Sequence, residues 1–258
     1  MKNGENKGRK SQRYFIPIQL EQMNQVKLMN RTDQKFWFHT DDLQDLLLVV
    51  SDDYYMLNVN GEYEIPYSTT YYDTGNNAMY ISHHNGKLNR YKIRRRSYLS
   101  SGISFLEIKF KNNKGRTIKE RIKSDFSQPC FSAQESEFIS THTPFTCEDL
   151  RPSLTNGFSR MTLVNKNFKE RCTIDLDLNY VANGDAIVLD KLVIIEIKRE
   201  GNKMYSPLEA ALKSERIKRA GFSKYCMGRS ITDPGLKQNA FKKKIRRIEK
   251  TIHQDLHT

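Results

Sequence analysis

The sequence predicts a mainly β fold with some α-helix, in which a long series of antiparallel strands forms a barrel or a sandwich with flanking helices. Between Tyr54 and Lys198, apolar residues recur at every second position, which is the period of a strand with one buried face. Asn-Gly pairs and similar polar segments separate these stretches, as they do in hairpins. The 13 Tyr and 13 Phe are more aromatic residues than a disordered chain carries.

The region before the sheet is expected to hold a leader and one helix. Residues 1–26 are rich in basic and polar residues, so we expect a flexible basic leader. After residues 40–42, apolar side chains recur at helical spacing, which predicts a helix. These apolar positions are Leu43, Leu46, Leu47 and Val50.

The alternating pattern predicts eight strands. They are expected at residues 54–59, 68–73, 88–98, 104–111, 117–123, 159–165, 170–178 and 191–199. Turns are expected at residues 60–61, 85–86, 112–115 and 183–184. Residues 128–154 carry Ser, Thr and Pro, and we interpret them as a connection between two halves of the sheet that can hold one short helix.

Two helices are expected after the strands. The first has Ser206 as N-cap, Pro207 at its first position and Gly221 as its stop. The second opens at Asp233 and combines an apolar stripe with many Lys and Arg residues. Residues 231–258 are therefore expected to form a basic amphipathic C-terminal helix.

Composition narrows the classes of function. The 43 Lys and Arg outnumber the 30 Asp and Glu and give a net charge of +13, which indicates a polyanionic partner. No apolar run approaches the roughly 20 residues of a membrane-spanning helix, so we expect no transmembrane segment. The four cysteines form no CxxC pair, which argues against a zinc site or a disulfide scaffold and favours the cytoplasm.

The basic residues of the strands occur at every second position and therefore lie on one face of each strand. In the stretch 90–96, every second residue is basic, whereas Tyr91 and Ile93 point to the opposite face. A solvated face usually mixes both charge signs, but these faces hold mostly Lys and Arg. If the faces turn inward they form a cationic tunnel, in which phosphate groups would supply the missing partners. A carboxylate among them, above all Glu196, suits a divalent cation that bridges phosphates.

These segments, in this order, resemble the VTC domain (vacuolar transporter chaperone, or polyphosphate polymerase, domain) of the triphosphate tunnel metalloenzyme superfamily. The similar segments are residues 29–36, 70–74, 80–86, 90–98, 105–109, 117–121, 159–160, 170–175, 195–198 and 222–225. The resemblance covers residues 27–230. It implies a barrel lined by Arg and Lys that binds a triphosphate with Mn²⁺ or Mg²⁺ and moves the γ-phosphate of ATP, or of another nucleoside triphosphate, onto polyphosphate.

The resemblance also implies which residues form the site. The catalytic positions carried over are Lys35, Arg94, Arg96, Lys109, Lys119, Arg160, Arg171 and Lys224. Glu196 corresponds to the metal-binding glutamate. Further basic residues on the same strand faces are expected to bind phosphate, namely Arg90, Lys92, Arg121 and Lys198.

The chain departs from the superfamily pattern at two places. Hydrolytic members carry an ExExK signature on the first strand, and here those positions are Arg31, Asp33 and Lys35. The loss of one carboxylate argues against two-metal hydrolysis and favours the polymerase-like branch. Gly221 stands where eukaryotic polymerase domains tend to carry a second lysine.

Other functions stay open at this point. A metal-dependent hydrolase of tri- or polyphosphate could use the same tunnel, and a non-catalytic polyphosphate or nucleotide binder is a third class. Nucleic acid is not an expected partner. The basic residues alternate along the strands and so lie on one face of the sheet, whereas nucleic-acid binding would rest on exposed basic patches with aromatic residues among them. The C-terminal helix is interpreted as a solvated basic face, with contact to an acidic surface as the alternative.

Several single residues also have structural interpretations. Glu107, Asp175 and Glu196 could simply pair with neighbouring basic residues. The pair at residues 83–84, two histidines, is expected in a turn and not at a metal site. Trp37 and the tyrosines at 71–72 are expected in the core or at its rim, and the cysteines in the core.

Overall fold

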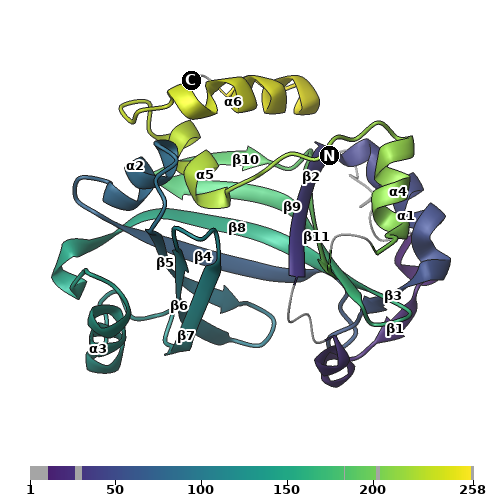
Figure 1. Ribbon diagram of the computed structural model, residues 1–258, viewed down its shortest axis with the longest axis horizontal. Coiled ribbons are helices and arrows are strands. Elements are labelled where there is room, and N and C mark those ends of the chain that lie inside the picture. The colour runs from purple at the N-terminus through teal and green to yellow at the C-terminus, as the bar shows by residue number, and fades with distance from the viewer. Residues whose placement is uncertain (1–10, 27–30, 183, 202–203, 257–258) are drawn as a thin grey trace, which may run out of the picture. The chain divides into compact units, whose positions relative to one another are not determined.

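The computed structural model describes residues 11–26, 31–182, 184–201 and 204–256 (Figure 1). The chain divides into two compact units. Unit 1 comprises Met1–Ile65, Ser159–Asp177 and Leu189–Phe222, and unit 2 comprises Pro66–Phe158, Leu178–Val188 and Ser223–Thr258. Two long strands, β8 (Leu150–Asn165) and β9 (Glu170–Ala182), pass through both units.

Unit 1 is built on a sheet with the strand order β2-β11-β9-β8-β3-β1. Its remaining strands are β1 (Ile16–Ile18), β2 (Arg31–His39), β3 (Tyr54–Leu57) and β11 (Leu192–Glu200). β11 pairs antiparallel with β2 and β9, β3 pairs antiparallel with β8, and β1 pairs parallel with β3. The helical segments are η2 (Ser11–Tyr14), η3 (Leu20–Gln25), η4 (Thr40–Asp42), α1 (Leu43–Val50), η5 (Ser51–Asp53) and α4 (Pro207–Ser214).

The core of unit 1 lies between α1, α4 and one face of this sheet. The four apolar positions predicted for α1 are all buried, and they share a cluster with Leu208 and Leu212 of α4. α4 begins as predicted, since Ser206 Oγ accepts a hydrogen bond from the backbone N–H of Glu209 and Pro207 occupies the first turn. It ends at Ser214, before the expected stop at Gly221.

Unit 2 is built on a sheet with the strand order β10-β9-β8-β4-β5-β6-β7. Its other strands are β4 (Ile65–Thr74), β5 (Arg90–Tyr98), β6 (Ile103–Lys111), β7 (Thr117–Ser124) and β10 (Asp185–Leu189). β4 to β7 form a consecutive antiparallel series. The helical segments are α2 (Ala78–His84), α3 (Ala133–His142), η6 (Cys147–Asp149), α5 (Lys224–Thr232) and α6 (Asn239–Ile252).

One face of β5–β7 is apolar and is covered by α3. Ile93, Leu106 and Ile108 pack there with Phe138 and Ile139 of α3. Arg95 also points to this side, where its guanidinium forms a fully buried ion pair with Glu135 at 2.7 Å. α3 is therefore fixed to the sheet by a charge pair as well as by apolar contacts, and the opposite face of β5–β7 is left to the charged residues.

α6 belongs to unit 2 and buries its apolar stripe there. Phe241, Ile245, Ile248 and Ile252 are all buried, and the backbone N–H of Ala240 donates to Nε2 of His84 at 3.1 Å. Most Lys and Arg residues of the helix remain exposed. No helix in the described parts of the chain has both the length and the apolar character needed to span a membrane.

The expected fold class is confirmed as a mainly antiparallel sheet with flanking helices, but the sheet is not closed into a barrel. Within the described residues the main strand order ends at β2 and at β7, and these two do not pair. β7 carries Lys119, Arg121 and Lys123 on one face and is largely exposed. Charged side chains on an edge strand oppose pairing with another strand.

Several element boundaries differ from the sequence expectations. Residues 150–154 are not part of a connection but the beginning of β8, whereas α3 is the short helix expected before them. α6 begins at Asn239 instead of Asp233, and α5 was not expected at all. His83 and His84 end the helix α2 and do not form a turn.

The N-terminal region also differs from the expected leader. Residues 1–10 lie outside the described part of the chain, but residues 11–26 form η2, β1 and η3. Phe15 and Ile18 are buried, because β1 pairs with β3 and draws this segment into unit 1. The two compact units also divide the expected 27–230 domain.

Candidate functional site

The charged side of β5–β7 in unit 2 is the first candidate site, and we call it the cationic face. The antiparallel register places its residues in rows across the three strands. These rows are Arg96–Phe105–Lys123, Arg94–Glu107–Arg121, Lys92–Lys109–Lys119 and Arg90–Lys111–Thr117. The face therefore carries nine basic residues and one acidic residue, as the alternation in the sequence predicted.

Glu107 is the acidic residue of the cationic face and is fully buried. Arg94 contacts its Oε2 through Nε at 2.7 Å and through Nη2 at 2.5 Å, and Lys119 Nζ lies 2.5 Å from Oε1. Burial alone would raise the pKa of Glu107, but Arg94, Arg96 and Lys119 hold the pKa well below its usual range. Glu107 is thus a permanent anion that fixes two of the expected catalytic residues.

The row next to Glu107 contains three lysines and no carboxylate. Lys92, Lys109 and Lys119 lie directly opposite one another on neighbouring strands. Like charges in such positions repel and destabilise the sheet. The positive charge of Arg94, and then burial, hold the pKa of Lys109 well below its usual range. An anion bound over this row would relieve the repulsion.

Aromatic rings orient the remaining cations of this face. The Arg94 guanidinium lies 5.9 Å from the ring centre of Tyr71, and that of Arg96 lies 5.7 Å from Phe158. Lys224, the first residue of α5, places its Nζ 4.5 Å from the same Phe158 ring. This shared ring brings Lys224 beside Arg96, although the two are far apart in the sequence.

The second candidate site is the charged side of β2, β11, β9 and β8 in unit 1, which we call the balanced face. Its register pairs Glu196 with Lys35 and Thr173, and Lys198 with Asp33 and Arg171. The face carries both charge signs, with Lys35, Arg160, Arg171 and Lys198 beside Asp33, Asp175 and Glu196. Lys35, Lys198 and Arg160 form ion pairs with carboxylates of the same face.

Glu196 is the centre of the balanced face. Lys35 Nζ contacts its Oε1 and Lys198 Nζ contacts its Oε2. Burial alone would raise the pKa of Glu196, but Lys198 and Lys35 hold it well below its usual range. Burial lowers the pKa of Lys198 in spite of this pairing.

Arg160 is held in a similar way. Its Nε and Nη2 donate to the two carboxylate oxygens of Asp175 at 2.6 and 2.9 Å, which is a bidentate pair. Glu107, Asp175 and Glu196 thus all form the ion pairs that the sequence left open as their structural interpretation. A pair of this kind also presents the outer side of the guanidinium or ammonium group to a ligand.

A metal centre made of protein ligands alone does not fit these residues. No group of three or more His, Cys, Asp or Glu that could hold a metal ion occurs in the described ranges. Both oxygens of Glu196 contact lysines. Mg²⁺ keeps several waters and uses few protein ligands, so Glu196 fits a divalent cation as a single protein ligand once one of its two lysines moves away.

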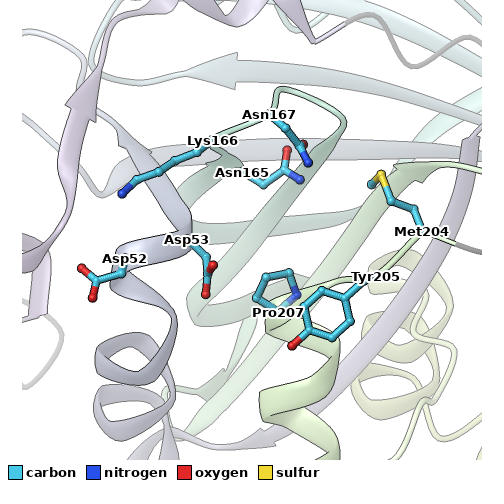
Figure 2. Close-up of a pocket in the computed structure, with 8 residues that line it drawn as sticks. All are labelled: Asp52, Asp53, Asn165, Lys166, Asn167, Met204, Tyr205 and Pro207. Atoms are coloured by element: carbon cyan, nitrogen blue, oxygen red, sulfur yellow. The ribbon is translucent and has the colours of Figure 1, made fainter.

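An open pocket of about 520 Å³ in unit 1 lies apart from the expected site residues (Figure 2). It is lined by Asp52, Asp53, Asn165, Lys166, Asn167, Met204, Tyr205 and Pro207. None of them is an expected catalytic, phosphate-binding or metal-binding residue, so the candidate site rests on the strand faces.

The structure divides the expected site residues between the two faces. The cationic face collects Arg90, Lys92, Arg94, Arg96, Lys109, Lys119 and Arg121, with Lys224 beside it. The balanced face collects Lys35, Arg160, Arg171, Glu196 and Lys198. The sequence analysis assigned no role in the site to Glu107 or Lys111. Their alternation along β6 nevertheless places both on the charged side of the strand.

Comparisons with known proteins point to one family. The family model of the VTC domain matches residues 30–232. No curated protein matches the chain.

Among solved structures, a candidate adenylyl cyclase from Hippeastrum, described as having a dominant triphosphatase activity, is 14% identical with a TM-score of 0.47. The match covers 78% of this chain and 96% of that one. A candidate adenylate cyclase from Bacillus halodurans is 13% identical with a TM-score of 0.44, over 76% and 96% of the two chains. A conserved hypothetical protein from Pyrococcus furiosus is 9% identical with a TM-score of 0.40, over 72% and 95%.

Proposed function

The chain belongs to the VTC domain family, and from this premise we propose that it is a polyphosphate polymerase-like phosphotransferase. It would move the γ-phosphate of ATP, or of another nucleoside triphosphate, onto a polyphosphate chain. The observation that carries the proposal is the carboxylate-free row Lys92–Lys109–Lys119 beside the Arg94–Glu107 pair. A polyanion is the ligand that such a row lacks.

The roles follow from how each side chain is held. Arg94 is fixed by Glu107 and Arg96 by aromatic rings, so both can present planar donors to the triphosphate. Lys109 and Lys119 would neutralise charge on the transferring group, and Lys224 would reach the same region from α5. Arg90, Lys92 and Arg121 would bind further phosphates along the strands.

The residues of the balanced face keep the roles that the family resemblance implies, and these roles stay a prediction. Lys35, Lys198 and Arg160 would exchange part of their contacts with carboxylates for contacts with phosphate oxygens. Arg171 would contact phosphate oxygens as well. Glu196 would hold Mn²⁺ or Mg²⁺. When bound, the cation would supply positive charge that neutralises the charge developing on the phosphate oxygens.

The reaction asks the protein mainly for alignment and charge neutralisation. A terminal oxygen of the acceptor chain forms a bond to the γ-phosphorus, and the bond from that phosphorus to the β,γ-bridging oxygen breaks, which releases ADP. The acceptor oxygen is already anionic, so no general base is needed. Arg94 and Lys109 would stabilise the charge on the oxygens of the transferring group.

Incubation of the purified chain with ATP and Mn²⁺, followed by chain-length analysis of the products, tests the proposal. We expect long-chain polyphosphate and ADP from the native chain. Arg94→Ala should lower the rate by roughly 10²–10³-fold, because it removes a charge donor fixed toward the reacting phosphates. Arg246→Ala, an exposed arginine on α6, is the matched control and should keep the native rate within about twofold.

The second candidate function is hydrolysis of tri- or polyphosphate at the same residues. Orthophosphate or pyrophosphate as the main product, without long chains, would establish it and contradict the polymerase. The first strand disfavours hydrolysis, because a basic residue replaces one carboxylate of the hydrolytic signature at Arg31. Tight triphosphate binding without turnover under any divalent metal would instead support a binding module.

The exposed basic residues of α6 bear on which partners the chain could contact. Contact of α6 with an acidic surface would use only its exposed Lys and Arg residues, because its apolar stripe is buried in unit 2 and is not available for insertion. Nucleic acid is not an expected partner, and the cytoplasmic location inferred from the cysteine pattern stays a prediction.

A further inference from the structure

The helix α5 begins beside the cationic face and carries Lys224 as its first residue. Ser223 caps this helix, since its Oγ accepts a hydrogen bond from the backbone N–H of Cys226 at 3.3 Å. The same Oγ accepts a hydrogen bond from Nζ of Lys92 at 3.0 Å, which ties the start of α5 to β5. The place of Lys224 relative to the proposed phosphates therefore depends on how the first turn of α5 is held.

One side chain anchors this first turn in the interior of unit 2. Tyr225 directly follows Lys224 and is buried, and its hydroxyl donates a hydrogen bond to Oδ2 of Asp73, which is buried as well. Burial, and then the negative charge of Asp73, hold the pKa of Tyr225 well above its usual range. The hydroxyl therefore stays protonated and remains a donor at the pH of an activity assay.

Asp73 is itself fixed by backbone groups. Its Oδ1 accepts hydrogen bonds from the N–H groups of Thr74 and Met79 at 2.8 and 2.9 Å. Its Oδ2 accepts one from the N–H of Tyr80 at 2.9 Å. Two of these donors lie in the first turn of α2, where N–H groups lack partners within the helix. Tyr225 thus ties α5 to a carboxylate whose position β4 and α2 already define.

The ring of Tyr225 contributes to the support of a second cation. It stacks on the ring of Tyr71 with 5.0 Å between the ring centres. The hydroxyl of Tyr71 in turn accepts a hydrogen bond from Nη1 of Arg94 at 3.4 Å. Replacement of Tyr225 by Phe would keep the stacked ring and remove only the hydroxyl, so it isolates the bond that holds α5.

The rest of α5 is held independently of this tyrosine. A Cβ atom at Gly228 would lie 2.5 Å from side-chain atoms of Leu154 and Tyr180, so the absence of a side chain lets the helix approach β8 and β9 closely. Arg229 donates a hydrogen bond to the backbone carbonyl of Ser153 at 2.9 Å. Loss of the tyrosine hydroxyl should therefore leave α5 docked on the sheet while its first turn shifts.

We propose that Tyr225, anchored on Asp73, is a positioning residue for Lys224. It keeps the ammonium group of Lys224 beside Arg96, where both cations contact the ring of Phe158. The inference rests on the proposed function for the identity of the reaction. Because the tyrosine acts through the lysine, its effect should appear in the rate of phosphoryl transfer and not in the binding of ATP.

A double-mutant cycle of Tyr225→Phe and Lys224→Ala tests the inference, with polyphosphate formation from ATP and Mn²⁺ as the readout. Tyr225→Phe should lower kcat roughly tenfold and keep KM for ATP within about twofold, because it misplaces an ammonium group without removing it. Lys224→Ala should lower kcat further, by roughly 10²-fold relative to the native chain. The double variant should have the same kcat as Lys224→Ala, since the tyrosine then has no lysine to position.

Tyr54→Phe is the matched control. Tyr54 is also buried and its hydroxyl also donates to a buried carboxylate, that of Glu170, but both residues belong to unit 1 and neither is an expected site residue. The control should lower the urea midpoint of unfolding at least as much as Tyr225→Phe does, and it should keep kcat within about twofold of the native value.

Three results would overturn the positioning role. The first is a native kcat in Tyr225→Phe. The second is an equal fall of kcat in Tyr54→Phe, because loss of any buried hydrogen bond of this kind would then be enough. The third is a double variant that is roughly tenfold slower than Lys224→Ala, since the tyrosine would then act on the fold and not through the lysine.

The native chain separates this inference from the proposed function. Formation of polyphosphate, with independent effects of the two substitutions, would contradict the inference alone. Release of orthophosphate or pyrophosphate without polyphosphate would contradict the polymerase, and the same cycle measured on the rate of release then decides the inference. A native chain that does not turn over ATP would contradict both.

Discussion

The two charged faces are built from the same kind of strand, but they differ in how many carboxylates stand beside their basic residues. On the balanced face, Lys35 and Lys198 share Glu196, and Arg160 holds Asp175 in a bidentate pair. On the cationic face, Glu107 is the sole carboxylate among nine basic residues. One face is nearly neutral by itself, whereas the other carries a large positive surplus.

The difference links the balanced face to stability of the fold and the cationic face to binding of an anion. The balanced face stabilises its own unit, because Lys35, Lys198 and Arg160 each have a carboxylate partner. On a face with surplus positive charge, the contacts between like charges lower the stability of the sheet, and the same charges raise its affinity for an anion. The cationic face is therefore the stronger candidate for binding phosphate, and Glu107 neutralises part of its charge from within the protein.

The largest effect is expected at Glu107. Glu107→Gln should lower the free energy of unfolding by about 3–5 kcal/mol, because it leaves the buried Arg94 without its anion and removes the partner of Lys119. Saturating tripolyphosphate should recover part of this loss, since phosphate oxygens replace the carboxylate. Urea unfolding with and without tripolyphosphate measures both quantities.

Glu120→Gln is the control for this variant, since Glu120 is exposed on the opposite side of β7. It should change the free energy of unfolding by no more than about 0.5 kcal/mol. Equal stability of the two variants would remove Glu107 from its organising role.

Lysine-to-methionine changes on the two faces should have opposite signs. Lys109→Met removes a charge that its neighbours repel, so we expect the free energy of unfolding to rise by about 1 kcal/mol. Lys198→Met removes a partner of Glu196, so we expect a fall of about 1–2 kcal/mol. Paired urea unfolding measures the difference, and changes of the same sign in both variants would contradict the contrast between the faces.

The smallest effect is a dependence on alkaline pH. The pKa of Lys109 lies below its usual range in the folded chain, and the unfolded value is about 10.4. Between these two values the unfolded chain binds more protons, so the stability contribution of Lys109 should increase as pH rises. Thermal unfolding from pH 7 to 10 should show a rise that is smaller in Lys109→Met. An unchanged slope in that variant would assign the effect to other lysines.

The strand faces were predictable because alternation is a local property of the sequence. Every second residue from Arg90 to Arg96 lies on one face in the structure, as the period of two requires. Register between strands follows from short hairpins, which is why the rows across β5, β6 and β7 agree with the expected grouping.

The structure differs from the sequence expectations where contacts between distant segments determine the local conformation. Arg95 lies buried beneath α3 because Glu135 reaches it from a segment that the sequence did not connect to this strand. The histidines at 83–84 end a helix that packs on α6, and neither contact has a local signal.

A crystal structure of the chain with tripolyphosphate bound tests the central claim most directly. The account predicts phosphate oxygens within hydrogen-bonding distance of Arg94, Lys109 and Lys119, with Glu107 still paired to Arg94. Tripolyphosphate bound on the exposed side of α6 or elsewhere, with no phosphate oxygen near Lys109, would contradict it.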